Sequence, residues 1–107
     1  MNSEIFAAIN NALIETGQRQ LNDEIELKEF LLYRAKEVKT EILDSHRWYD
    51  SINQIVIIGT VYIRYAWYHM TGDDNPQDMG LDFNYDSISI VEPYEETVIN
   101  YRNIQTK

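Results

Sequence analysis

The spacing of hydrophobic residues along the chain changes near Ser45. Before that point, apolar side chains recur every three or four positions, which is the period of an amphipathic helix. Ile5, Ile9 and Leu13 follow this spacing, and we expect a first helix from about Ser3 to Thr16. Gly17 can adopt the left-handed conformation that often ends a helix.

The same period continues further along the chain and predicts a second, longer helix from about Asp23 to Asp44. Acidic residues cluster at its expected start, where they complement the positive end of the helix dipole. The positions of its apolar seam are Leu27, Leu31, Ala35, Val38 and Ile42.

After Ser45 the period falls towards two, and β-branched and aromatic residues dominate. This pattern predicts four strands, with a tight turn at Gly59-Thr60 and a loop over residues 71–80. The expected strands are 55–58 (starting as early as Trp48), 61–70, 87–91 and 97–102.

The order of these elements indicates an α+β fold, with two N-terminal helices packed on a four-stranded antiparallel meander sheet. A chain of 107 residues is the length of one domain. We therefore expect a single domain over 1–107, with a helical part at 1–44 and a β-sheet part at 45–107.

Composition narrows the classes of function. The chain carries 9 basic and 18 acidic residues, a net charge of −9, which disfavours direct binding to nucleic acid or an anionic membrane. The absence of Cys excludes thiol nucleophiles, disulfides and Cys-ligated metals. We find no secretory signal, and no apolar run approaches the roughly 20 residues of a membrane span. We expect a cytoplasmic protein.

The acidic charge is concentrated in the last third of the chain. Residues 1–40 carry 7 acids and 5 bases, residues 41–72 carry 3 and 2, and residues 73–107 carry 8 and 2. No Lys or Arg occurs between Arg64 and Arg102. The eight acids of this interval form a field of carboxylates that can imitate the phosphates of a nucleic acid. Solubility and protection of strand edges are the alternative explanation.

No motif indicates catalysis or a bound cofactor. The acidic loop from Asp73 fails the EF-hand template, because Asp78 occupies the position where glycine is required. His46 and His69 have no Gly-x-Ser-x-Gly nucleophile motif to accompany them. We therefore predict no catalytic, cofactor-binding or metal-binding residues, although an irregular cation site in the 73–82 loop stays open.

The residues that we expect to contact a partner are the acids of this field and three tyrosines that supply aromatic anchors. The expected partner is a basic protein. The contact residues are Asp73, Asp74, Asp78, Asp82, Asp86, Glu92, Glu95, Glu96, Tyr62, Tyr68 and Tyr94.

Several stretches resemble small bacteriophage proteins, notably His46-Arg47-Trp48-Tyr49, Thr71-Gly72-Asp73 and Val91-Glu92-Pro93, together with 78–83. The short, acidic, cysteine-free character also resembles phage-encoded anti-CRISPR and anti-restriction inhibitors, some of which mimic nucleic acid. This resemblance carries over no functional residue. It implies a non-enzymatic inhibitor, in the cytoplasm of a bacterial host, that blocks a basic nucleic-acid-processing protein.

Two alternatives stay open at this point. The first is an immunity or antitoxin protein that neutralises a basic toxin nuclease. The second is a structural or assembly protein that self-associates through the aromatic face of its sheet. The sequence leaves the oligomeric state undetermined.

Overall fold

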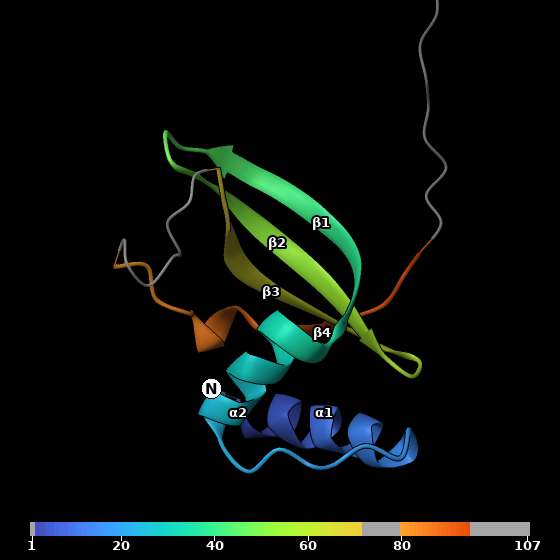
Figure 1. Cartoon of the computed structure of the whole chain (residues 1–107). Helices are drawn as coiled ribbons and strands as arrows, with labels where there is room; N and C mark the ends of the chain where they lie inside the picture. The colour runs from blue at the N-terminus through green and yellow to red at the C-terminus, as the bar shows by residue number, and fades with distance from the viewer. Residues whose placement is uncertain (1, 72–79, 95–107) are drawn as a thin grey trace, which may run out of the picture.

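The computed structural model describes residues 2–71 and 80–94 (Figure 1). Two short helices come first in the chain, and the strands follow them. The elements are α1 (Ser3–Glu15), α2 (Glu24–Glu29), a π-helical turn (Phe30–Arg34), β1 (Lys36–Ser45), β2 (Tyr49–Ile58), β3 (Val61–Met70), a 3-10 turn (Tyr85–Ser87) and β4 (Ser89–Val91).

Helix α1 confirms the first predicted helix. The Asn2 side chain accepts a hydrogen bond from the Glu4 backbone N–H and so caps the first turn. Gly17, with φ of 74°, takes the left-handed conformation just beyond the last turn. Ile9 and Leu13 are fully buried on one face of the helix, which is the stripe that the apolar spacing predicts.

The second predicted helix is wrong over its C-terminal half. Helix α2 ends at Glu29, the π-helical turn ends at Arg34, and the chain continues as strand β1 from Lys36. The helical part of the chain therefore does not extend to residue 44. Val38, Thr40 and Ile42 are β-branched, so this segment fits a pleated surface, and pairing with β2 outweighs its helical periodicity.

The π-helical turn connects the helices to the sheet. The Ala35 N–H donates to the Phe30 carbonyl five residues earlier, which leaves the Leu31 carbonyl available. The Tyr65 hydroxyl, from the centre of β3, donates to this carbonyl at 2.9 Å. Tyr65 is almost fully buried, and a buried hydroxyl needs such a partner. This hydrogen bond gives a partner both to a carbonyl at the end of the helical segment and to the hydroxyl of a core side chain.

The four strands form one antiparallel sheet in the order β1-β2-β3-β4. The α+β class and the four-stranded antiparallel sheet are therefore confirmed. β3 has the predicted bounds, and β2 begins at Tyr49, next to the earliest predicted start. Gly59, with φ of 60°, opens the two-residue turn between them. The strand predicted at 97–102 lies outside the described residues.

One face of the sheet, here called the inner face, packs against the helices. Ile63 and Tyr65 of β3 and Val56 of β2 are buried there against Leu13 of α1 and Leu27 of α2. Figure 1 shows both helices beneath one end of the sheet, while the end that carries the β1–β2 turn extends away from them. Along β3 the side chains alternate, so that Ile63 and Tyr65 share the buried face and Tyr62 and Arg64 lie on the opposite face.

A membrane-spanning helix needs more length and more apolar residues than any helix within residues 2–71 and 80–94 offers.

The Tyr65 contact yields a test of how the helices are held. We expect Tyr65→Phe to lower the free energy of unfolding by about 1–2 kcal/mol, because it leaves the buried Leu31 carbonyl without its donor. Urea denaturation measures this. The matched control is Tyr33→Phe, at a side chain that is 75% exposed, and it should leave the stability unchanged.

The contribution of Tyr65 to stability has a defined pH dependence. Burial, and to a lesser extent the Glu37 carboxylate, raises the pKa of Tyr65 above the ordinary value of 10.0. Above about pH 10 the Tyr65 hydroxyl loses its proton in the unfolded state and keeps it in the folded state. The free energy of unfolding of the wild type therefore falls as pH rises. The stability difference between wild type and Tyr65→Phe should therefore shrink by about 1.4 kcal/mol per pH unit above pH 10. A constant difference up to pH 11.5 would contradict this account.

Candidate functional site

The candidate site is a groove on the outer face of the sheet, opposite the helices. Its volume is about 470 Å³. All four strands line it, together with the three residues that follow β4. The lining residues are Val38, Lys39 and Glu41 of β1, Ile55 of β2, Tyr62 and Arg64 of β3, Val91 of β4, and Glu92, Pro93 and Tyr94.

Strand register places the floor of the groove. Lys39 pairs with Ile55, and Ile55 pairs with Arg64, so these three side chains form a row across the outer face. In the neighbouring row, Tyr62 pairs with Val91. An apolar and aromatic floor is thus bordered by two cations, one from β1 and one from β3.

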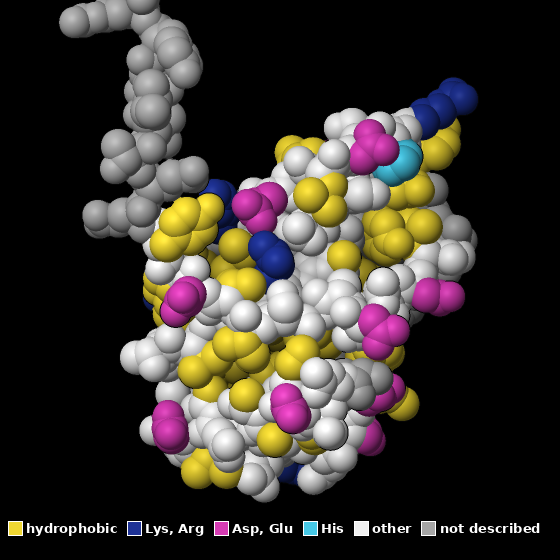
Figure 2. All heavy atoms as spheres, turned by 180° about the vertical axis from the view of Figure 1, so that it is seen from behind, with side chains coloured by type: hydrophobic (Ala, Val, Ile, Leu, Met, Phe, Trp, Pro, Cys, Tyr) yellow, Lys and Arg dark blue, Asp and Glu magenta, His cyan; other side chains and the backbone are white. Residues whose placement is uncertain are grey.

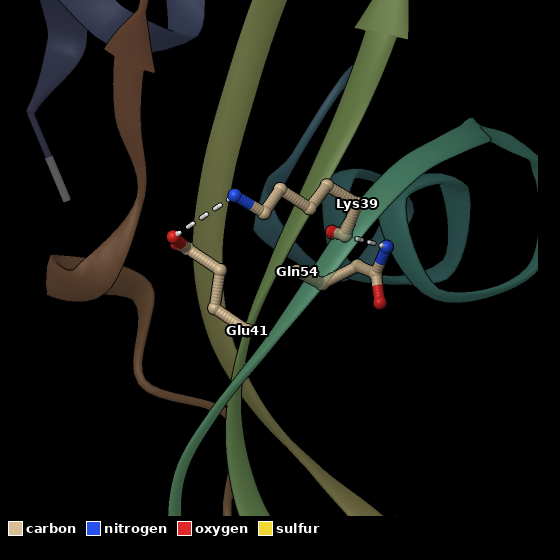
Figure 3. A network of polar contacts seen from close by, with 3 residues as sticks. All are labelled: Lys39, Glu41 and Gln54. Carbon is tan, nitrogen blue, oxygen red and sulfur yellow. Dashed lines mark hydrogen bonds and ion pairs between the residues drawn. The ribbon is translucent and has the colours of Figure 1, made fainter. Parts of the chain in front are cut away.

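The groove carries charges of both signs. Lys39 and Arg64 contribute two positive charges, and Glu41 and Glu92 contribute two negative charges. Lys39 Nζ lies 3.9 Å from Glu41 Oε2 along the same strand (Figure 3). Both side chains are partly exposed, so this ion pair contributes little to stability and stays free to exchange for a ligand group.

The buried side chain of Gln54 holds β1 in place behind the groove (Figure 3). Its Nε2 donates to the Lys39 carbonyl at 3.0 Å and to the Ile55 carbonyl at 3.3 Å. Its Oε1 accepts from the Thr40 hydroxyl at 2.7 Å. The pairing of β1 with β2 shifts between Glu37 and Lys39. Gln54 therefore satisfies the backbone next to this bulge and fixes the position of Lys39.

Three of the predicted contact residues meet in the groove: Tyr62, Glu92 and Tyr94. Tyr94 is 78% exposed and Tyr62 is half-buried. Tyr68 lies elsewhere, with its ring edge-on to Tyr49 at 5.4 Å. It borders a separate hollow of about 530 Å³, which is lined by inner-face residues such as Ile52 and Gln54.

The predicted acids do not form one group in the described chain. Asp82 and Asp86 are exposed next to Phe83 and Tyr85, and Phe83 packs against the inner-face residue Tyr65 at 5.7 Å. Glu92 instead lines the groove. The other predicted acids lie outside the described residues, and they are Asp73, Asp74, Asp78, Glu95 and Glu96.

Acids from the helical part approach the segment that contains Asp86. The pKa of Tyr85 is raised by burial and by the carboxylates of Glu24 and Asp23 at the start of α2. Asp86 follows Tyr85 directly in the chain, so the start of α2 lies close to the segment that contains this predicted contact residue. Sequence reasoning placed Asp23 and Glu24 at a helix start but not beside the later acids.

The side of the molecule seen in Figure 2 shows the same dispersion. Its acidic side chains stand singly among hydrophobic and basic ones, with no continuous acidic patch. Among the described residues, the carboxylates on this side are therefore spaced across the surface.

The chain matches no protein family. It also matches no curated protein and no solved structure.

The turn between β1 and β2 brings together a serine, a histidine and an aspartate. His46 Nε2 lies 3.1 Å from Ser51 Oγ and 3.7 Å from Asp44 Oδ2. A catalytic triad uses the two ring nitrogens separately, one for the serine and one for the aspartate. Here a single nitrogen faces both groups, so this arrangement differs from a triad. Within the described ranges, no three His, Asp or Glu side chains could hold a metal ion.

Sequence reasoning missed Lys39 and Arg64 as groove residues. The net charge of −9 favours the acids as contact residues, and Lys39 lies within the segment predicted as a helix. The signal that could have found β1 is the β-branched residue at every second position, Val38, Thr40 and Ile42.

Gln54 provides a test of how the groove is supported. We expect Gln54→Leu to lower the free energy of unfolding by about 1–3 kcal/mol, because the Thr40 hydroxyl and the Lys39 carbonyl lose their partner. Amide hydrogen exchange in β1 should also accelerate. Asn53→Leu, one position away on the other face, is the matched control with a smaller expected effect. Equal stability of Gln54→Leu and wild type would contradict the role of Gln54.

Proposed function

We propose that the protein is a non-enzymatic binding protein whose outer-face groove holds a segment of a protein partner. The observation that carries this proposal is the convergence of Tyr62, Tyr94 and Glu92 with Lys39 and Arg64 on a sheet face that no described helix covers. Aromatic residues and arginine are the side chains most enriched at the energetic centres of protein interfaces.

The chemistry of the groove favours a peptide segment as the ligand. The floor offers Ile55 and Val91 for apolar contact, and the tyrosine rings provide area with hydroxyl groups at their edges. The paired charges match the backbone and side-chain polarity of a polypeptide. Two cations and two carboxylates balance, so the groove itself does not select a ligand by net charge.

The acidic residues outside the groove supply long-range selection in this proposal. The net charge of −9 attracts a basic protein and raises the rate of encounter, and added salt weakens that attraction. We propose that the partner is a basic nucleic-acid-binding protein of a bacterial host, and that the protein inhibits it as a phage-encoded nucleic-acid mimic. The support is the interval of eight acids without a base between Arg64 and Arg102.

The test begins with capture of a partner from bacterial lysate at low and high salt, followed by affinity measurement with the purified partner. We expect Tyr94→Ala to weaken binding at least about tenfold, because a hot-spot tyrosine loses its aromatic contact. Tyr33→Ala is the matched control, since its side chain is equally exposed but lies outside the groove, and it should bind like wild type.

A second variant separates the electrostatic attraction of the partner by the acidic residues from the contacts made in the groove. Replacing Asp74, Asp78, Asp82 and Asp86 with Asn should lower the association rate and flatten its dependence on salt, with little change in the dissociation rate. If affinity and salt dependence both stay unchanged, the acidic-surface mechanism is wrong. Equal effects of Tyr94→Ala and Tyr33→Ala on affinity would contradict binding of the partner in the groove. A captured toxin nuclease would favour the immunity-protein alternative.

A further inference from the structure

Strand β1 is a long and open edge of the sheet. It has ten residues, and among the described residues it pairs on one side only, with β2. Nearly all of its side chains are exposed, including apolar ones such as Ile42 at 65% and Leu43 at 59%. An exposed strand edge carries unpaired backbone N–H and C=O groups and is a template for pairing with another strand.

The register of β1 on β2 assigns its side chains to the two faces. Thr40 lies opposite the buried Gln54, and Ile42 lies opposite the buried Ile52, so both belong to the inner face. Val38 and Leu43 are the extra residues at two bulges. The outer-face residues that pair with β2 are all charged, and they are Lys36, Lys39, Glu41 and Asp44.

We propose that a second copy of this chain pairs antiparallel with β1, about a two-fold axis at Thr40. In this register each of the four charged outer-face residues that pair with β2 meets a residue of opposite charge from the other copy, and each bulge residue meets an inner-face residue. The pairs are Lys36 with Asp44, Lys39 with Glu41, Val38 with Ile42, Glu37 with Leu43, and Thr40 with Thr40.

Neighbouring registers lack this match. An axis at Glu41 places two glutamates directly opposite each other, and an axis at Lys39 places two lysines opposite each other, which is unfavourable. An axis between two residues sets the outer-face Glu41 against the inner-face Thr40, which the alternation of strands forbids. Only the axis at Thr40 sets Lys36, Lys39, Glu41 and Asp44 against residues of opposite charge on the same face.

The charges and bulges of β1 have a competing explanation, since such features also protect edges from pairing. That explanation does not require opposite charges at positions symmetric about one residue. Charges of one sign would protect the edge better, whereas β1 alternates Lys and Glu around Thr40. One strand pair is a small interface, so we expect a dimer that dissociates on dilution.

This dimer would join two four-stranded sheets into one of eight strands. Lys39 and Glu41 also line the outer-face groove, so the grooves of the two copies would lie side by side across the axis. The inference goes beyond the proposed function, since a groove on a single copy binds in the same way. Self-association here uses a strand edge rather than the aromatic face that the sequence suggested.

The first test uses the absence of Cys from the chain. Residues directly opposite in an antiparallel pair have Cα atoms about 4.5–5.5 Å apart, within the range that a disulfide bridges. Under mild oxidation, Thr40→Cys should give a disulfide-linked dimer. Leu43→Cys is the matched control: it is exposed on the same strand, but roughly 20 Å would separate the two copies of this position.

The second test is a charge exchange followed by sedimentation equilibrium. Lys36→Asp and Asp44→Lys should each raise the dimer dissociation constant about tenfold, because each places like charges opposite one another twice in the dimer. The double variant should restore the wild-type value. Within one chain these residues are eight positions apart, roughly 26 Å along a strand, so recovery reports contact between copies.

Circular dichroism of every variant checks that the fold is kept. Three results would each overturn the proposal: a wild-type protein that stays monomeric up to about 1 mM, cross-linking of Thr40→Cys no faster than that of Leu43→Cys, or a double variant that fails to restore association. None of these results bears on the groove, which Tyr94→Ala tests separately.

Discussion

The hydrogen bond from the Tyr65 hydroxyl to the Leu31 carbonyl is the contact on which the arrangement of helices and sheet depends. Tyr65 occupies the centre of the buried face and cannot leave its hydroxyl without an acceptor. The π-helical turn frees the Leu31 carbonyl, because Ala35 donates to Phe30 instead. The same turn ends the helical segment, and the chain emerges at Lys36 as a strand. One polar contact therefore joins the end of the helices to the middle of the sheet.

The position of residues 36–45 at the edge of the sheet creates both the outer-face groove and the exposed edge of β1. The strand adds Lys39 and Glu41 to the outer-face groove, and Gln54 fixes the backbone beside them. No other described strand pairs with its other side, and its outer-face charges are placed symmetrically about Thr40. If this segment were helical, the groove would lose one wall and the sheet its long free edge.

The sequence predicts the parts of the fold whose local pattern and tertiary context agree. Helix α1 and strand β3 have clear periods of hydrophobicity, and the structure confirms both. Residues 36–45 satisfy a helical seam through Val38 and Ile42 and a strand alternation through the same two residues, so periodicity alone cannot decide between them. Strand pairing decides it, with partners that lie 5 to 21 residues further along.

Some residues of the candidate site can likewise be predicted from the sequence, and others cannot. Tyr62 and Tyr94 could be proposed because exposed tyrosines are common anchors, and both line the groove. Arg64 and Lys39 join them only through strand register, which no local pattern contains. NMR of the isotope-labelled protein tests the central claim, that residues 36–45 form the edge strand. The account predicts nuclear Overhauser contacts between Thr40 and Gln54 and between Ile42 and Ile52. Contacts between residues three apart along 36–44, typical of a helix, would contradict it.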